Sequence, residues 1–251
     1  MSNADHFYQE ILTGFRKLAE QKGILDENIT INGKILNTQE AIGIPSRDDF
    51  PLLMGKEFLM EADYKGSKGQ AFTNCPGNFN GTICEITKTL PKNSFEYAVL
   101  ISSMNAVGKH LGLCEKTIHC RNEGPELCAE HIVASIKKMD IYRATSNPLK
   151  IALVGYQPSF LDKLARNFNL RCLDLDLSRI GQKKFGITIE QGVDNMRDAL
   201  NWADMILVTG STLCNGTIVN YLSHKNTYFF GTTISATAAL LGLKRMCFEA
   251  E

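Results

Sequence analysis

Long apolar runs are scarce in this chain of 251 residues. The apolar runs are short, such as MILV at 205–208 and ATAALLGL at 236–243, far below the roughly 18 residues that a membrane-spanning helix needs. The opening MSNADHFYQEILTGF lacks the basic segment followed by a long apolar run that a secretory signal peptide requires. We therefore expect a cytoplasmic protein with no membrane partner.

Net charge is absent as well, because 27 Lys and Arg residues balance 27 Asp and Glu residues. Without a surplus of either sign, no long-range field attracts a polyanion, an anionic membrane or an acidic substrate. We accordingly expect no nucleic-acid partner. The sequence leaves open whether the chain forms a homo-oligomer.

Several short motifs of nucleotide and hydrolytic sites are also missing. The chain has no G-x-x-x-x-G-K-[ST], no H-E-x-x-H and no G-x-S-x-G. The sequence therefore does not support a P-loop, a zincin metal site or the nucleophile elbow of a hydrolase. Whether the protein is an enzyme stays open.

The apolar pattern of the first half predicts a small α+β unit. In residues 5–22 apolar side chains recur at helical spacing, with Asp5 as the candidate N-cap and Gly23 where the helix should stop. Residues 24–90 carry short β-like pieces broken by Gly, Pro and Asn. A second helix is predicted over 94–111, between the two halves of the chain.

Beyond residue 150, short apolar runs alternate with segments of helix length. The runs are IALV (151–154), LRCLDLD (170–176), MILV (205–208) and TYFF (227–230). This alternation is typical of a parallel sheet with crossover helices on its faces. We therefore predict the α/β class, with an N-terminal α+β domain at 1–92 and a Rossmann-like domain with flanking helices at 93–251.

The residues that follow these runs form the predicted ligand site, because an open parallel sheet binds ligands beyond the carboxyl ends of its strands. Segment TGSTLCNGT (209–217) offers backbone N–H groups and hydroxyls where a helix should begin, which suits a phosphate or carboxylate. Alternatively, Ser211 or Thr212 is only an N-cap. The predicted ligand-binding residues of these loops are Gly155, Tyr156, Gln157, Pro158, Asp174, Asp176, Gly210, Ser211, Thr212, Asn215, Gly231 and Thr232.

Asp174 also suggests a nucleotide. It lies 19 positions after Gly155, close to the ~20 at which dinucleotide-binding folds place the carboxylate that binds ribose. The turn reads GYQPSF, however, and Tyr156 and Gln157 stand where the pyrophosphate needs glycine. A nucleotide-dependent or S-adenosylmethionine-dependent transferase is therefore an alternative function.

A charged loop of the first half adds two candidates. SRDDFPLLMGKEFLMEA (46–62) surrounds the apolar FPLLM with charges, and Arg47 and Lys56 are its predicted ligand-binding residues. Such a loop can pack at one end and offer polar groups at the other. The alternative is a solvated loop that caps a helix at 51–61.

The stretch HCRNEGPELCAEH (119–131) groups histidines with cysteines. Pro125 suits the first turn of a helix over 125–139, so one loop and one helical turn could supply four ligands to a transition or heavy metal. Thiolates favour zinc, copper(I) or an iron–sulfur cluster. The candidate metal ligands are His119, Cys120, Cys128 and His131.

Core packing is the alternative for this stretch. The spacing of its ligands is not that of a standard zinc finger. Cys128 falls in line with Ile132 and Ile136, the apolar stripe by which the helix would pack. The thiol of Cys128 can therefore be explained without a metal.

Seven stretches together resemble a prokaryotic family known as "putative heavy-metal chelation". The resemblance covers the chain from about residue 40 to 247, and the stretches read GIPSRDDFPLLMGKEFLMEA, GQAFT, NAVGKHLGL, TIHCRNEGPELCAEHI, KIALVGYQPSFLDKL, LDLDLSRIGQKKFGI and ILVTGSTLCNGTI. The resemblance implies a small domain similar to the enolase N-terminal fold, followed by a Rossmann-like domain. It also implies a site where the two domains meet and a role in metal chelation or in handling a metal-bearing cofactor.

Two functions remain beside the transferase. One is a protein that handles a small molecule or metal complex in a crevice between the halves, at the strand ends. The other is a non-catalytic protein that holds a soft metal or an iron–sulfur cluster on the ligands of residues 119–131.

Overall fold

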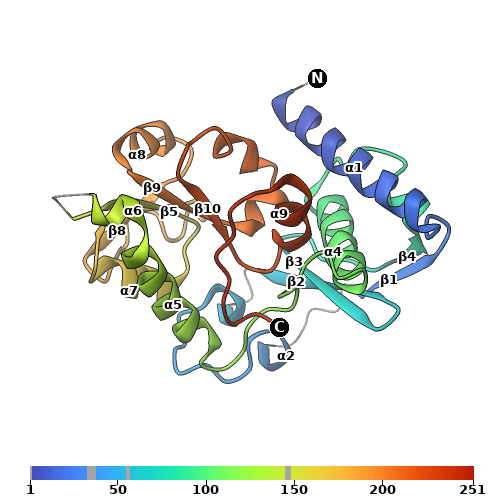
Figure 1. Cartoon of the computed structure of the whole chain (residues 1–251). Helices are drawn as coiled ribbons and strands as arrows, with labels where there is room; N and C mark the ends of the chain where they lie inside the picture. The colour runs from blue at the N-terminus through green and yellow to red at the C-terminus, as the bar shows by residue number, and fades with distance from the viewer. Residues whose placement is uncertain (1, 33–37, 55–56, 145–147) are drawn as a thin grey trace.

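The computed structural model describes residues 2–32, 38–54, 57–144 and 148–251. Lys56, one of the predicted ligand-binding residues, lies outside these ranges. Within them the chain forms two halves, each built on one sheet (Figure 1). No helix in the described ranges has the length and apolar content to span a membrane.

The first half is built on a four-stranded antiparallel sheet with strand order β3-β2-β1-β4. Its elements are α1 (Asn3–Lys22), β1 (Asn28–Asn32), α2 (Thr38–Ile42), η1 (Pro51–Met54), β2 (Phe58–Tyr64), β3 (Ser67–Thr73), β4 (Phe79–Thr82), α3 (Ile83–Ile86) and α4 (Ser94–His110).

The local sequence sets both ends of α1. Ser2 is the N-cap: its hydroxyl accepts a hydrogen bond from the Asp5 N–H at 3.1 Å, and the Asp5 carboxylate accepts one from the Ser2 N–H at 2.9 Å. Gly23 ends the helix with φ at +67°, which glycine adopts without steric cost. The predicted helix is confirmed, but the N-cap is Ser2, because Asp5 serves as the acidic third residue of a capping box.

Helix α4 confirms the helix predicted over 94–111, and residues 98–108 are all buried. It packs across β3 and β2 on one side and against α9 (Ser235–Leu241) on the other. Because α4 contacts elements of both halves, the predicted domain boundary between residues 92 and 93 stays a prediction.

The second half is built on a six-stranded sheet with strand order β10-β9-β5-β6-β8-β7, parallel except for β7. The four predicted strands and the predicted α/β class are confirmed, while the enolase-like and Rossmann-like assignments stay predictions. The elements before α9 are α5 (Gly124–Lys138), α6 (Asp140–Arg143), β5 (Lys150–Val154), α7 (Pro158–Ala165), β6 (Asn169–Asp174), β7 (Lys183–Lys184), β8 (Ile187–Gln191), α8 (Met196–Trp202), β9 (Met205–Thr209), η2 (Gly210–Leu213), η3 (Thr217–Asn220) and β10 (Thr227–Phe230).

The parallel sheet is buried on both faces. Ala152 and Val154 of β5 join the core that continues into the first half, whereas Ile151 and Leu153 face a second core under α5 and α7. The alternation follows from the two-residue repeat of a strand. One apolar core therefore runs through both halves and places the strand ends beside the first half.

Two expected helices are replaced by other structures. No helix spans 51–61: residues 51–54 form one short turn, and β2 begins at Phe58. No α-helix follows β9 either, and the loop forms the 3-10 turns η2 and η3. Gly216 separates them with φ at +77°, and the Asn215 Oδ1 atom accepts a hydrogen bond from the Thr217 N–H at 3.1 Å. The local turn at Asn215 competes with a helix for these backbone groups.

One buried side chain ties the halves together. Asn105 of α4 donates from Nδ2 to the carbonyl oxygen of Gln70 at 2.9 Å and to those of Thr232 and Thr233 at 3.2 Å each. Its Oδ1 atom accepts from the Ala236 N–H at 2.8 Å. The amide therefore joins β3 to the loop after β10.

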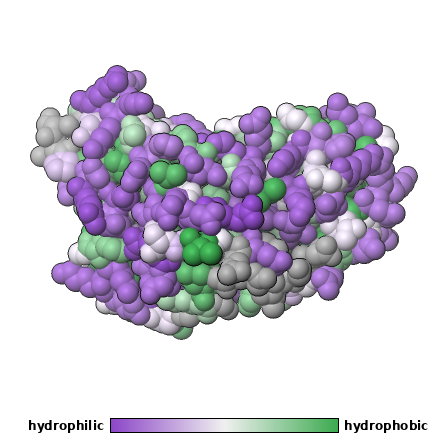
Figure 2. All heavy atoms as spheres, turned by 90° about the horizontal axis from the view of Figure 1, so that it is seen from below, coloured by the Kyte–Doolittle hydropathy of each residue, from purple (hydrophilic) through white to green (hydrophobic). Residues whose placement is uncertain are grey.

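The segment after α9 makes further contacts between distant parts of the chain. The Ile118 N–H donates to the Glu251 carbonyl oxygen at 2.8 Å, and the Glu251 N–H donates back at 3.0 Å. Near the other end, the Tyr8 hydroxyl of α1 donates to the carbonyl oxygen of Leu213. Seen from below, the outer surface is mainly hydrophilic, with hydrophobic residues in small groups (Figure 2).

Candidate functional site

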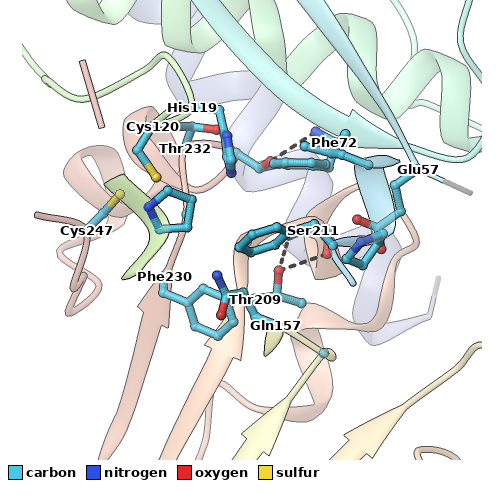
Figure 3. Close-up of a pocket in the computed structure, with 18 of the residues that line it drawn as sticks. Glu57, Phe72, His119, Cys120, Gln157, Thr209, Ser211, Phe230, Thr232 and Cys247 are labelled. Carbon is cyan, nitrogen blue, oxygen red and sulfur yellow. Dashed lines mark hydrogen bonds between the residues drawn. The ribbon is translucent and has the colours of Figure 1, made fainter. Parts of the chain in front are cut away.

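A cavity lies where loops of the two halves meet, and it holds about 860 Å³ of empty space, part of it open to solvent. The first half contributes mainly apolar side chains and Glu57, and the second half contributes the loops after its strands (Figure 3). Seven of the predicted ligand-binding residues line it: Gly155, Tyr156, Gln157, Gly210, Ser211, Gly231 and Thr232.

Two further hollows adjoin the cavity and share Glu57 and Ser211 with it. They bring in four more predicted residues, namely Asp174, Asp176, Thr212 and Asn215. Pro158 does not line any of the three and instead begins α7 as a buried residue. The structure thus brings eleven of the twelve predicted strand-end residues to one connected region.

Arg47 lies apart from this region. Its guanidinium group contacts Asp49 at 2.9 Å, Glu126 at 3.4 Å and Asp162 at 3.6 Å. It therefore links the loop after α2 to α5 and α7. The residue borders a separate shallow depression next to Asp48.

The Asp174 carboxylate stabilises the loops at the strand ends by accepting backbone hydrogen bonds. One of its carboxylate oxygens accepts from the Tyr156 N–H at 2.6 Å and the other from the Asp176 N–H at 2.7 Å. The Nη1 atom of Arg179 lies 3.7 Å away. A ribose hydroxyl at Asp174 would have to compete with these backbone donors.

Other polar groups of the same loops also stabilise their own turns. The Gln157 Oε1 atom accepts from the Phe160 N–H at 2.5 Å and caps α7. The Thr212 hydroxyl donates to the Thr209 carbonyl oxygen at 2.7 Å. In contrast, the buried Thr232 hydroxyl has no hydrogen-bond partner among the described residues. A buried hydroxyl without a hydrogen bond destabilises the fold, so binding of a ligand or a water molecule that hydrogen-bonds to it would be favourable.

Glu57 is a candidate that the sequence interpretation missed. Its carboxyl group is partly buried where the cavity and both hollows meet. Its pKa is raised to about 7, chiefly by burial; the Arg179 guanidinium opposes the rise, and the Asp174 and Asp176 carboxylates contribute to it. The only sequence signal was its place beside Lys56 in the charged loop, because the aspartates that surround it lie far away in the chain.

The four candidate metal ligands are not all brought together. His119, Cys120 and Cys128 line the cavity, whereas His131 is exposed and binds Glu249 with its Nδ1 atom 2.8 Å from Oε1. Across the described part of the chain, no group of three or more His, Cys, Asp or Glu side chains is arranged to hold a metal ion. The chain's own residues therefore do not form the four-ligand site in this arrangement.

His119 lies in the cavity wall as a neutral imidazole. Its Nδ1 atom is 3.3 Å from the Ala41 carbonyl oxygen, and its ring meets Phe72 edge to face at a centroid distance of 5.3 Å. Burial lowers its pKa to about 4. Figure 3 places this ring near the end of the pocket where the sulfur atoms of Cys120 and Cys247 lie.

Cys247 is a second residue that the sequence interpretation missed. It lines the cavity and forms a hydrogen bond with Cys128. That bond and the nearby Arg245 lower the pKa of the Cys247 thiol against the effect of burial. The same bond and burial raise the pKa of Cys128. No local motif could have paired two cysteines this far apart in the sequence.

Comparisons with known proteins connect the second half to one family. Residues 138–243 match the sequence profile of DUF364, described as "Putative heavy-metal chelation". The resemblance is thereby confirmed over this segment. A comparison with curated proteins gives no match.

Two solved structures are similar to the chain. One is a DUF364 protein of unknown function from Pyrococcus horikoshii, with a TM-score of 0.52, 12% identity, and coverage of 90% of this chain and 79% of that one. The other is a DUF364 protein of unknown function from Desulfitobacterium hafniense DCB-2, with a TM-score of 0.43, 12% identity, and coverage of 73% and 72%. The first supports the fold.

Proposed function

We propose that the protein binds a small molecule or a metal complex in the cavity between its halves. The observation that carries this proposal is the cavity itself, lined on one side by the loops after parallel strands and on the other by the first half. Ligands of open α/β sheets bind at this edge. The family description over residues 138–243 supports a metal-bearing ligand.

The lining indicates what kind of ligand fits. Phe50, Phe72, Phe160 and Phe230 provide apolar walls. Polar groups are few and lie at separate places: Glu57 at one end, the unsatisfied Thr232 hydroxyl in the wall and the thiols at the other end. A ligand with an apolar body and two or three polar or metal-bound groups matches this distribution.

A variant that fills the cavity tests the proposal. Ser211→Trp places an indole at the junction of the three hollows, and Ser223→Trp on the exposed surface is the matched control. Full-length proteins, freshly isolated without oxygen, are compared by native mass spectrometry and elemental analysis. We expect bound mass on the wild type and on Ser223→Trp, and its loss from Ser211→Trp. An unliganded wild type, or equal bound mass on all three proteins, would contradict the proposal.

A further inference from the structure

One of the two hollows beside the cavity contains a buried arginine with an unused hydrogen-bond donor. This hollow, named the Arg179 hollow below, holds about 1000 Å³ of empty space, part of it open to solvent. The residues that line it include Glu57, Asn74, Asp176, Arg179 and Ser211. Arg179 is 7% exposed, and its Nη2 atom is buried without a hydrogen-bond partner among the described residues.

The rest of the Arg179 guanidinium group is held in place. Its Nε atom lies 3.4 Å from Oδ2 of Asp176, and its Nη1 atom lies 3.7 Å from Oδ2 of Asp174. Its Cζ atom lies 5.2 Å from the centre of the Tyr156 ring. Because these contacts fix the planar group, Nη2 cannot turn to another partner without breaking them. A buried donor without an acceptor is destabilising, so a ligand atom that accepts from Nη2 would bind favourably.

Several acceptor atoms of the Arg179 hollow already serve its own loops. The two carboxylate oxygens of Asp174 accept backbone N–H groups at 2.6 and 2.7 Å. The Oδ1 atom of Asp176 accepts from the N–H and hydroxyl of Ser178 at 2.9 and 2.7 Å. The Oδ1 atom of Asn215 accepts from the N–H and hydroxyl of Thr217 at 3.1 and 2.7 Å. The Nη2 donor of Arg179 is therefore matched by an acceptor oxygen on a ligand.

The charges around the Arg179 hollow favour an uncharged oxygen. Among the described residues that line it, the carboxyl groups of Glu57, Asp174 and Asp176 stand against the single guanidinium group of Arg179. A carboxylate or phosphate on the ligand would therefore meet more groups of its own sign than of the opposite sign. A carbonyl oxygen brings no charge, and its hydrogen bond to a charged donor is of the stronger kind.

The neighbouring cavity supplies the place for the rest of the ligand. Phe72 lines both the Arg179 hollow and the larger cavity, where three further phenylalanines form apolar walls. Figure 3 shows Glu57 at one side of the pocket, with Phe72 and Ser211 between it and the cysteines. An aromatic ring in the cavity can therefore carry a polar group into the hollow.

We propose that the Arg179 hollow binds an uncharged carbonyl group, as in a carboxamide or a ring lactam, attached to an aromatic ligand body. The Nη2 atom of Arg179 donates to the carbonyl oxygen. The N–H group of the amide can donate to the carboxyl group of Glu57, which lines the same hollow. The inference rests on the proposed function, because it names the ligand group that occupies the Glu57 end of the same site.

Three probes of one shape and different charge test the proposal. Benzamide carries an uncharged carboxamide, benzoate a carboxylate, and benzamidinium a cationic group without an acceptor atom. Each is titrated into dialysed, isotope-labelled full-length protein and followed by NMR. We expect benzamide to bind with a dissociation constant of about 1 mM or lower, and to shift the Nε–H signal of Arg179. Benzoate and benzamidinium should bind at least about tenfold more weakly.

Two variants locate the effect. Arg179→Met removes the donor and should weaken benzamide binding at least about tenfold. It should also make benzamidinium the preferred probe, because three carboxyl groups then remain without a cation, and loss of loop structure alone would not reverse the order. Arg143→Met changes an exposed arginine of α6 and should leave all three affinities unchanged. Thermal melting followed by circular dichroism verifies folding. If Arg179→Met does not fold, the wild-type order of the probes and the shifted Arg179 signal decide.

The outcomes separate this inference from the proposed function. Absence of benzamide binding, equal or tighter binding of benzoate, or tightest binding of benzamidinium to the wild type would overturn the carbonyl assignment. If that happens while Ser211→Trp still loses the bound mass, the ligand cavity stands. If the probes bind in the expected order but no mass occupies the cavity of the isolated protein, the ligand proposal alone is wrong.

Discussion

Glu57 is a carboxylic acid held partly out of water, close to two aspartates and one arginine. Its pKa of about 7 lies well above that of an ordinary glutamate, 4.5. Because the folded protein holds this proton over a range in which the unfolded chain has released it, folding takes up a proton there. The carboxyl group is therefore a source of pH-dependent stability at the centre of the candidate site.

Replacing Glu57 by glutamine should remove this dependence. Below pH 4.5 both side chains are neutral and the two proteins should be equally stable. As pH rises through 7, the wild type has to bury a charge and loses up to about 3 kcal/mol relative to Glu57→Gln. Urea unfolding at pH 5 and pH 8 measures the difference.

The control for this measurement is Glu10→Gln, which neutralises an exposed carboxylate on α1. It should change the free energy of unfolding by less than about 0.5 kcal/mol at either pH. If the difference in free energy of unfolding between Glu57→Gln and the wild type were the same at pH 5 and pH 8, the pKa of Glu57 would not be raised by folding.

Single residues also mark the limit of sequence interpretation. The end of α1 was predictable because Gly23 acts through local backbone geometry. Glu57 and Cys247 acquire their properties from residues far away in the chain, such as Asp174 and Cys128. Helix caps and turns can be predicted from neighbouring residues in the sequence. The pKa values of side chains and the contacts between cysteines depend on which distant residues the fold brings together.

At the scale of elements, the packing of α4 on β3 depends on one glycine. A Cβ atom at Gly69 would lie 2.1 Å from the Ala106 nitrogen and 2.5 Å from the Ser102 carbonyl oxygen. Both are backbone atoms, so neither can rotate away. The strand therefore approaches the helix more closely than any side chain permits.

We expect Gly69→Ala to destabilise the protein by at least about 1–3 kcal/mol, the usual cost of overpacking a core. Gly14→Ala is the matched control, because its nearest neighbour is a methyl group of Leu240 at 3.1 Å that can move. The added helix propensity at position 14 should offset that contact. Thermal unfolding of both variants provides the comparison, and equal melting temperatures would mean that α4 can shift away from β3.

The apolar pattern predicted the strands of the parallel sheet better than it predicted two of the helices. The runs IALV and MILV are strongly apolar because both faces of the parallel sheet are buried, and they became β5 and β9. The segment 51–61 mixes apolar and charged residues without a clear period, and its break into η1 and β2 was not predicted. The loop after β9 lacks the expected helix because Asn215 and Gly216 favour turns.

At the scale of the whole molecule, Asn105 couples the two halves. Its amide is fully buried and makes four hydrogen bonds to backbone groups on both sides. Because two of these groups belong to Thr232 and Thr233 in the cavity wall, the coupling also fixes the site. The local sequence did not indicate this role, because the backbone groups that Asn105 contacts lie far away in the chain.

Asn105→Ala should lower the free energy of unfolding by at least about 3 kcal/mol, because it leaves several buried backbone groups without partners. Asn201→Ala, at an exposed position of α8, should stay within about 0.5 kcal/mol of the wild type. Both values come from urea unfolding. A small effect of Asn105→Ala would indicate that water replaces the amide and that the halves are coupled elsewhere.

The hydrogen bond between Tyr8 and Leu213 has a consequence for biosynthesis. The two residues are 205 positions apart, so α1 leaves the ribosome roughly 10–40 s before its docking surface, at translation rates of about 5–20 residues per second. During that interval the buried face of α1, with Phe7, Ile11 and Phe15, has no partner from the second half. The nascent chain therefore leaves the part of this face that the second half covers open to chaperones until that half has been made.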